Sequence, residues 1–129
     1  MFEICSSSST RRFVFSDLSK DKFRFELEGD IYAAVDVWSI DGFTTILELF
    51  KGCASLDRPW VGSKSWGAIE GDLELFITCT SLGKVHILAK LSRAGIAEEW
   101  SAQVMLETEF GQLPSIASDA EAFFGGRDA

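Results

Sequence analysis

Two runs of alternating apolar and polar residues, separated by a short polar segment, constrain this chain more than any other feature. Apolar side chains occupy every second position from 73 to 79 and again from 85 to 91. This pattern is typical of a β-hairpin with one buried face. A three-residue loop at 81–83 sets Ile77 opposite Ile87 and ends on the glycine that such loops require. A two-residue loop pairs buried positions with exposed ones, so we expect the three-residue loop.

A third strand is predicted at 100–107, where the alternation resumes. We expect Leu91 to face Trp100, because this pairing continues the buried face of the hairpin. The same pairing places Trp100 in the core and His86 beside Met105 on the opposite face of the sheet.

The N-terminal half of the chain predicts further antiparallel strands. Residues 13–15 form a short apolar run, residues 23–28 alternate strictly, and the alternation continues over 31–37. A three-residue turn at 28–30 leaves Asp36 in solvent. A two-residue turn is also common in hairpins, but it buries this carboxylate without a partner, so we favour the three-residue turn.

Two segments have the periodicity of amphipathic helices. The first begins after Asp41, whose carboxylate can cap the free N–H groups, and Gly52 can end it. The second begins near Pro114, which suits the first turn of a helix, and Gly125-Gly126 ends it. Its apolar stripe consists of Leu113, Ile116, Ala117, Ala120, Phe123 and Phe124.

Together these elements predict an α+β fold: a single antiparallel, largely meander β-sheet of about five to seven strands with two helices packed on it. A chain of 129 residues is expected to form one domain, here 1–129. We expect residues 1–11 to be a frayed N-terminus, because serines precede the first predicted strand. We expect residues 125–129 to be a flexible tail.

Composition argues against several classes of ligand and several cellular locations. The formal net charge of −8 argues against nucleic acid and anionic membrane surfaces, and it is compatible with a basic protein partner. Solubility alone also explains such a charge. No apolar run approaches the ~20 residues of a membrane span, and the first residues lack a secretory signal. Cys5, Cys53 and Cys79 lack metal-ligand spacing, so we expect reduced thiols in a cytoplasmic protein without a metal or other cofactor.

The sequence contains no recognisable catalytic constellation. His86 is the one histidine, and its predicted position in mid-strand leaves it without an orienting partner. We therefore expect a surface or interface histidine in a protein that is not an enzyme. The alternative is an enzyme that uses carboxylates such as Asp36, Glu70 and Asp72.

The predicted outer sheet face is more apolar than a merely solvated face. We expect partner or ligand binding by residues of this face: Tyr32, Trp38, Phe76, His86, Leu88 and Met105. An acidic rim around it consists of Glu98, Glu99, Glu107 and Glu109. Two accounts remain open. Either a helix, the N-terminal strand or the loop at 56–60 covers this face, or the face is an interface.

Four segments together resemble a family of small bacterial domains of unknown function. They are Ala34–Trp38, Trp66–Leu73 (W-G-x-I-E-G-x-L), the Gly83–Val85 turn (G-x-V) and Phe123-Phe124. The resemblance spans most of the chain, from 13 to 124, and its motifs imply a fold rather than an activity. The turn position held by Lys84 is often histidine in that family, so this chain departs from the pattern there.

The chain also resembles, in size and charge only, bacterial immunity proteins that neutralise a cognate toxin. We therefore predict a non-catalytic cytoplasmic binding protein, immunity-like, that neutralises a basic partner. The alternative is a small-ligand-binding or homodimeric structural domain that uses the apolar outer face.

Overall fold

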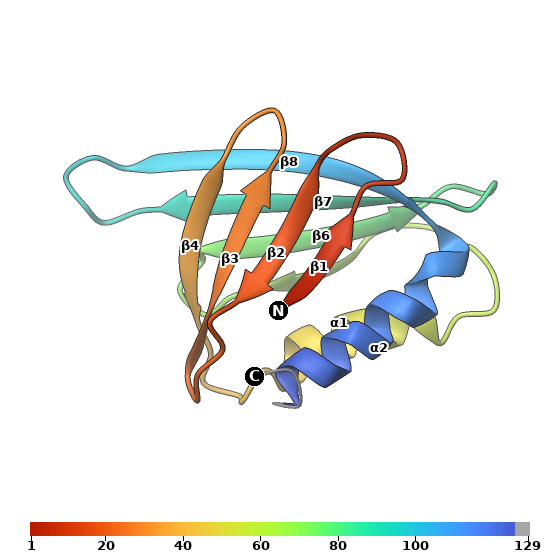
Figure 1. The fold of residues 1–129 in the computed structure, drawn as a ribbon, viewed down its shortest axis with the longest axis horizontal. Helices are drawn as coiled ribbons and strands as arrows, with labels where there is room; N and C mark the ends of the chain where they lie inside the picture. The colour runs from red at the N-terminus through yellow and green to blue at the C-terminus, as the bar shows by residue number, and fades with distance from the viewer. Residues whose placement is uncertain (126–129) are drawn as a thin grey trace.

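The fold consists of two antiparallel four-stranded sheets and two helices (Figure 1). The structure is a computed structural model that describes residues 1–125. Sheet A contains β1 (Phe2–Cys5), β2 (Arg12–Ser16), β3 (Lys22–Glu28) and β4 (Ala33–Trp38) in chain order. Sheet B contains β5 (Lys64–Gly67), β6 (Leu73–Cys79), β7 (Lys84–Arg93) and β8 (Trp100–Glu109), also in chain order. Helix α1 (Thr44–Ala54) connects the sheets, and a 3-10 turn (Phe110–Gln112) leads from β8 into α2 (Leu113–Phe124).

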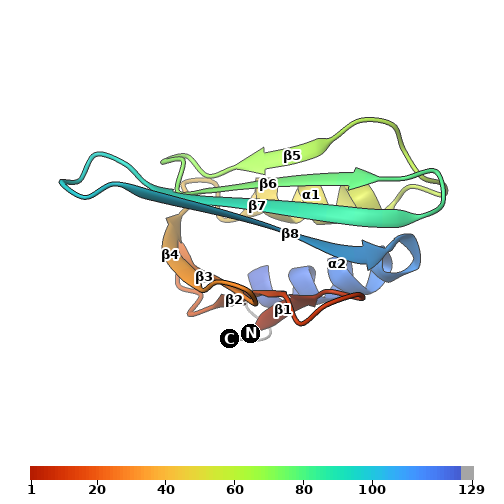
Figure 2. The ribbon, with the colours of Figure 1, turned by 90° about the horizontal axis from the view of Figure 1, so that it is seen from above.

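The two sheets form separate layers (Figure 2), and the two helices pack against each other beside the strands, at the lower right in Figure 1. One cluster of buried side chains joins both sheets and both helices. Phenylalanine rings connect the layers within it: Phe2 stacks on Phe15 with ring centroids 4.7 Å apart and meets Phe50 of α1 edge-on at 5.7 Å. The first strand of the chain therefore contributes directly to the hydrophobic core.

The central hairpin has the predicted register. Ile77 pairs with Ile87, and Leu73 pairs with Leu91 at the far end. All four of these side chains are buried. Gly83 has a φ of +86°, the left-handed conformation that the three-residue loop requires. The alternation of apolar residues thus determines both the pairing and the buried face of β6 and β7.

The pairing of β8 differs from the prediction by two residues. Leu91 pairs with Ala102 instead of Trp100, and His86 pairs with Glu107. Trp100 lies at the end of the hairpin and is exposed, so its predicted place in the core is wrong. A shift of two residues keeps every side chain on its own face, so the apolar pattern alone does not distinguish the two registers.

The N-terminal segment is a strand, and the prediction that residues 1–11 are frayed is wrong. Strand β1 pairs with β2 along its whole length. Phe2 and Ile4 are buried on one face of β1, where they join the core between sheet A and the helices. Two apolar side chains are enough for this strand because β2 already provides its hydrogen-bonding edge.

The α+β class is confirmed, but the eight strands form two sheets instead of the single predicted sheet. Alternation identifies strands without identifying their partners, and α1 separates β4 from β5 in the chain. The β3–β4 connection is also two residues longer than predicted, since Leu27 pairs with Ala33 and the exposed Ile31 lies in the loop. Asp36 remains on the outer face, as expected, where it pairs with Lys22.

Helix α1 begins close to the predicted position. The Asp41 carboxylate accepts hydrogen bonds from the backbone N–H groups of Phe43 and Thr45, at 3.0 and 3.2 Å. It thereby caps the first turn as predicted, although a left-handed Phe43 separates it from the helix. Gly52 does not end α1, which continues to Ala54.

Helix α2 buries the whole predicted stripe, from Leu113 to Phe124. Pro114 lies in its first turn, and Gly125 follows its last residue. Residues 126–129 of the predicted flexible tail (125–129) lie outside the described residues. Neither described helix is long and apolar enough to cross a membrane.

Candidate functional site

The outer face of sheet B carries a row of apolar side chains that are partly or fully exposed. Phe76 of β6, Leu88 of β7 and Met105 of β8 are cross-strand neighbours, and Met105 is 42% exposed. Within the described chain, no helix or strand lies over this face in Figures 1 and 2. For sheet B, neither a described helix nor the N-terminal strand therefore covers the face. We call these three side chains the apolar row.

Charged side chains flank the apolar row on one side. Glu74 pairs with Lys90 in the register of β6 and β7. The Lys90 ammonium lies 5.1 Å from the centroid of the Phe76 ring, within the range of a cation–π contact. The opposite charges of this pair nearly balance, so this side of the row is not a strongly acidic surface.

The predicted acidic rim is divided between two ends of the molecule. Glu107 lies 3.2 Å from Nε2 of His86, and Glu109 lies 2.7 Å from the Lys84 ammonium, so both flank the other side of the apolar row. The Glu109 carboxylate raises the pKa of Lys84. Glu98-Glu99 instead precede β8, in the loop at the far end of the β7–β8 hairpin.

Tyr32 lies in the β3–β4 loop beside sheet A, apart from the apolar row. Its hydroxyl donates to Glu26 at 2.6 Å and accepts from Arg24 at 3.3 Å. On the same sheet, Arg12 forms two further ion pairs across β1–β3. Exposed pairs of this kind contribute little to stability, typically ~0–1 kcal/mol. They satisfy the polar groups of this face, so Tyr32 is better explained as part of a charged surface than as a binding residue.

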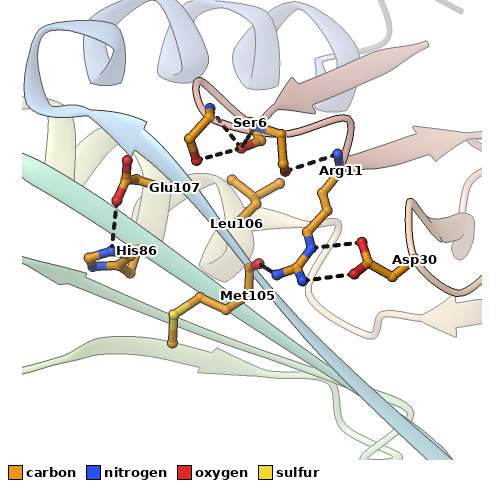
Figure 3. A pocket seen from close by; sticks show the side chains of 9 residues that line it. Ser6, Arg11, Asp30, His86, Met105, Leu106 and Glu107 are labelled. Carbon is orange, nitrogen blue, oxygen red and sulfur yellow. Dashed lines mark hydrogen bonds and ion pairs between the residues drawn. The ribbon is translucent and has the colours of Figure 1, made fainter.

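A groove of about 290 Å³ lies where the β1–β2 loop meets the edge of β8 (Figure 3). Ser7 donates its N–H to the carbonyl of Glu107 at 2.8 Å, and Arg11 Nη1 donates to the carbonyl of Met105 at 2.7 Å. Both carbonyls belong to the edge of sheet B, so the loop covers part of that edge.

The polar groups around this groove are engaged within the protein. Arg11 also makes a bidentate pair with Asp30, at 3.1 and 3.2 Å, which lowers the pKa of that carboxyl. Ser6 Oγ accepts hydrogen bonds from the N–H groups of Ser8 and Ser9. A Cβ atom at Gly29 would lie 2.8 Å from the Arg11 side chain, so only glycine permits this approach. We interpret Ser7, Arg11 and Asp30 as a latch between the sheets rather than as a ligand site.

Trp38 lies apart from the apolar row, at the end of β4. Around it the structure brings together two large apolar side chains that the sequence analysis did not select. Trp38, Ile40 and Ile69 are 44%, 82% and 62% exposed, and together they line two clefts. We call these three side chains the ridge. Ile40 and Ile69 lie in connecting segments, where the alternation of strands and the period of helices are both undefined. The sequence marks each of these two positions only by one large apolar residue within an otherwise polar turn.

Carboxylates border the ridge. The larger cleft has a volume of about 580 Å³ and is lined by Lys20, Asp21 and Glu70 beside the ridge, and the smaller, of about 260 Å³, is lined by Asp41. Among the described residues neither Asp21 nor Glu70 forms an ion pair. We call Asp21, Asp41 and Glu70 the acidic border. Pockets of several hundred Å³ with apolar walls and a few polar groups are typical of binding sites.

A family model matches residues 4–127, nearly the whole chain. The chain belongs to the family of unknown function DUF6228. Comparison with curated proteins found no match, and comparison with solved structures found none either. In this DUF6228 protein the W-G-x-I-E-G-x-L segment forms the end of β5, the turn after it and the first residue of β6, and Ile69 of that turn belongs to the ridge.

Hydrogen bonds hold the base of the ridge in the DUF6228 chain. Trp66 Nε1 donates to Thr45 Oγ1 at 2.9 Å, and the Thr45 hydroxyl donates in turn to the Asp41 carboxylate, so β5 and the start of α1 are connected. Hydrogen bonds from Ser39 and Thr45 lower the pKa of Asp41. This carboxylate therefore stays negative beside the ridge.

Trp38 already holds a cation in this DUF6228 protein. The Lys22 ammonium lies 5.2 Å from the centroid of the Trp38 ring and 3.7 Å from Oδ2 of Asp36. The Lys22 ammonium thus lies within reach of both the Trp38 ring and a carboxylate. A tryptophan face is the aromatic surface that binds cations best.

The groups considered for catalysis lie in different parts of the described chain, and His86 has a carboxylate partner, Glu107, that the sequence analysis did not predict. Within 1–125, no three His, Cys, Asp or Glu side chains converge as metal ligands would. Burial raises the pKa of the Cys53 thiol to about 11, which disfavours the reactive thiolate. Of the carboxylates considered for catalysis, Asp36 is paired on sheet A, and Glu70 and Asp72 lie in the β5–β6 turn. Burial, followed by the nearby Glu70 charge, raises the pKa of Asp72.

Proposed function

We propose that this DUF6228 protein is a non-catalytic binding protein whose partner is a basic protein that docks on the ridge. The observation that carries the proposal is the exposure of Trp38, Ile40 and Ile69 within a border of carboxylates. Exposed apolar side chains rimmed by polar ones are typical of protein interfaces.

The ridge has enough apolar surface to anchor a complex. Burying one isoleucine that is otherwise in water contributes about 1.5–3 kcal/mol, and tryptophan is among the residues that dominate binding energy at interfaces. Micromolar affinity requires about 8 kcal/mol in total. The ridge therefore supplies a large share of the binding free energy. The residues around it must supply the remainder and offset the entropic cost of association.

Charge supports a basic protein as the partner. The chain carries a net charge of −8, and both unpaired carboxylates of the larger cleft, Asp21 and Glu70, lie beside the ridge. An acidic surface accelerates the approach of a basic protein by ~10–10³-fold at low salt. The proposal includes an immunity-like role in a reducing, cytoplasmic setting, which is supported by the three free thiols.

The test compares three baits in affinity capture: the wild type, an Ile40→Ser/Ile69→Ser variant, and an Ile96→Ser/Leu82→Ser control with exposed apolar residues elsewhere. We expect a basic protein that the wild type and the control retain and the ridge variant loses. Its affinity, measured with purified protein, should fall as salt rises from about 50 to about 500 mM. The proposal is wrong if the three baits retain the same proteins or if the affinity does not respond to salt.

The uncovered apolar row favours a second candidate function, self-association through sheet B. Its flanking charges nearly balance, so a second copy meets less repulsion there than at the acidic border. Sedimentation at micromolar concentration tests it with a Met105→Glu variant as the comparison. A protein that remains monomeric and binds no apolar dye excludes this candidate.

A further inference from the structure

We infer that the partner reaches the larger cleft with a lysine that lies beside an apolar residue, its stem along Trp38 and its ammonium at the carboxylates of Asp21 and Glu70. This inference rests on the proposed function, since it names the chemistry of the partner at the same ridge. It goes beyond net charge because it assigns one side chain type to one cleft.

The walls and rim of the larger cleft match the two parts of a lysine side chain. Trp38, Ile40 and Ile69 provide apolar walls in a volume of about 580 Å³. The exposed Asp21 and Glu70 also line the cleft, and neither forms an ion pair among the described residues. Lysine lays its apolar stem on such walls and keeps its charged tip at the polar rim.

The Trp38 ring supports the same assignment, because it already binds an ammonium group. Lys22 places its nitrogen 5.2 Å from the ring centroid, with Asp36 within 3.7 Å of that nitrogen. An incoming lysine would repeat this arrangement of ring, ammonium and carboxylate, with Asp21 and Glu70 in the role of Asp36, and it would do so against the positive charge of Lys22.

Lysine fits the rim better than arginine does. Asp21 comes from the segment before β3 and Glu70 from the β5–β6 turn, so the two acceptors belong to separate parts of the chain. An ammonium has three donors that point in different directions, whereas a guanidinium is suited to one carboxylate bound by two parallel hydrogen bonds. Lys20 also lines the cleft, and its positive charge repels any bound cation. Removing that charge should therefore strengthen the binding of a lysine, whereas removing an acidic charge should weaken it.

The experiment uses the full chain and three capped tripeptides, Leu-Lys-Leu, Leu-norleucine-Leu and Leu-Arg-Leu. The readout is the NMR signals of the indole N–H groups of the four tryptophans, with Trp38 assigned from a Trp38→Phe variant. We expect a saturable shift of the Trp38 signal, with the lysine peptide binding at least about fivefold more tightly than the norleucine peptide. Equal affinity of these two peptides, tighter binding of the arginine peptide, or no saturable shift overturns the inference.

Two charge variants separate direct contact from an effect on folding. Glu70→Gln should weaken binding of the lysine peptide, and Lys20→Gln should strengthen it, each by about twofold to fivefold as is usual for exposed charges. Glu48→Gln on the exposed part of α1 should change nothing. A loss of folding moves all peptides in one direction, so unchanged or same-sign effects of the two cleft variants contradict the assignment.

The two proposals fail in different ways. A basic protein that needs the ridge but binds equally to wild type, Glu70→Gln and Lys20→Gln leaves the proposed function standing and overturns the lysine assignment. If the lysine peptide binds as expected while the ridge and control baits retain the same proteins, the cleft binds lysine and the proposed protein partner is wrong.

Discussion

Phe2 provides the sharpest test of how far the core extends toward the N-terminus. Its side chain is 1% exposed and contacts the rings of Phe15, Phe50, Phe123 and Phe124. Truncation of a buried phenylalanine to alanine removes its transfer free energy and leaves a cavity, which together cost about 3–5 kcal/mol. A domain of this size has a free energy of unfolding of about 5–15 kcal/mol. The Phe2→Ala variant should therefore lose at least about a fifth of its free energy of unfolding.

Urea unfolding followed by circular dichroism measures this loss. Phe2→Leu keeps an apolar side chain at the site and should cost roughly half as much. Ile40→Ala, at an exposed position, should stay within about 0.5 kcal/mol of the wild type. A Phe2→Ala variant within about 1 kcal/mol of the wild type would refute the reasoning, because that is the behaviour of a frayed terminus.

Three further predictions concern titratable groups. Asp41→Ala removes the cap of α1 and should cost about 1 kcal/mol at neutral pH. The pKa of Asp41 is lowered in the folded protein. The stabilisation by its carboxylate is therefore present above the ordinary pKa of 3.8 and is lost as pH falls through the folded pKa. The unfolding curves of the variant and the wild type should converge in acid. Asp72 has a raised pKa, so its charged form is disfavoured in the fold; Asp72→Asn should increase stability at neutral pH, and the increase should vanish below the unfolded pKa. An aromatic disulfide reagent at pH 8 should label the exposed Cys5 in the native protein and the buried Cys53 only after urea unfolding, as a time course of labelling would show.

The parts of the fold that the sequence predicts are those in which side-chain period and burial agree. Ile77 and Ile87 alternate with polar neighbours around a glycine, and a one-residue slip would move both into water. Their pairing is therefore specified locally. The stripe of α2 is specified in the same way by a period of 3.6 residues.

The parts that escaped prediction depend on contacts between segments distant in the chain. A two-residue shift of β8 preserves the buried face, so the place of Trp100 depends on the loop before it. The sequence alone predicted that Phe2 and Ile4 lie in a frayed end, because their burial depends on contacts with β2 and the helices. The candidate site shows the same limit. Trp38 was selected because of its parity on a strand, whereas Ile40 and Ile69 become neighbours of Trp38 only when the β5–β6 turn meets the end of β4.

The latch has a consequence for how the molecule assembles. Arg11 joins Asp30 of the β3–β4 loop to the carbonyl of Met105, which lies 94 residues from Arg11 in the sequence. Contacts of such long sequence separation form after local hairpins, because the intervening chain must first be ordered. Docking of sheet A on β8 is thus expected as a late step of folding, after each sheet has its own hydrogen bonds. The same contacts should be among the first to break, so amide hydrogen exchange in the 6–11 loop should precede exchange in β6 and β7.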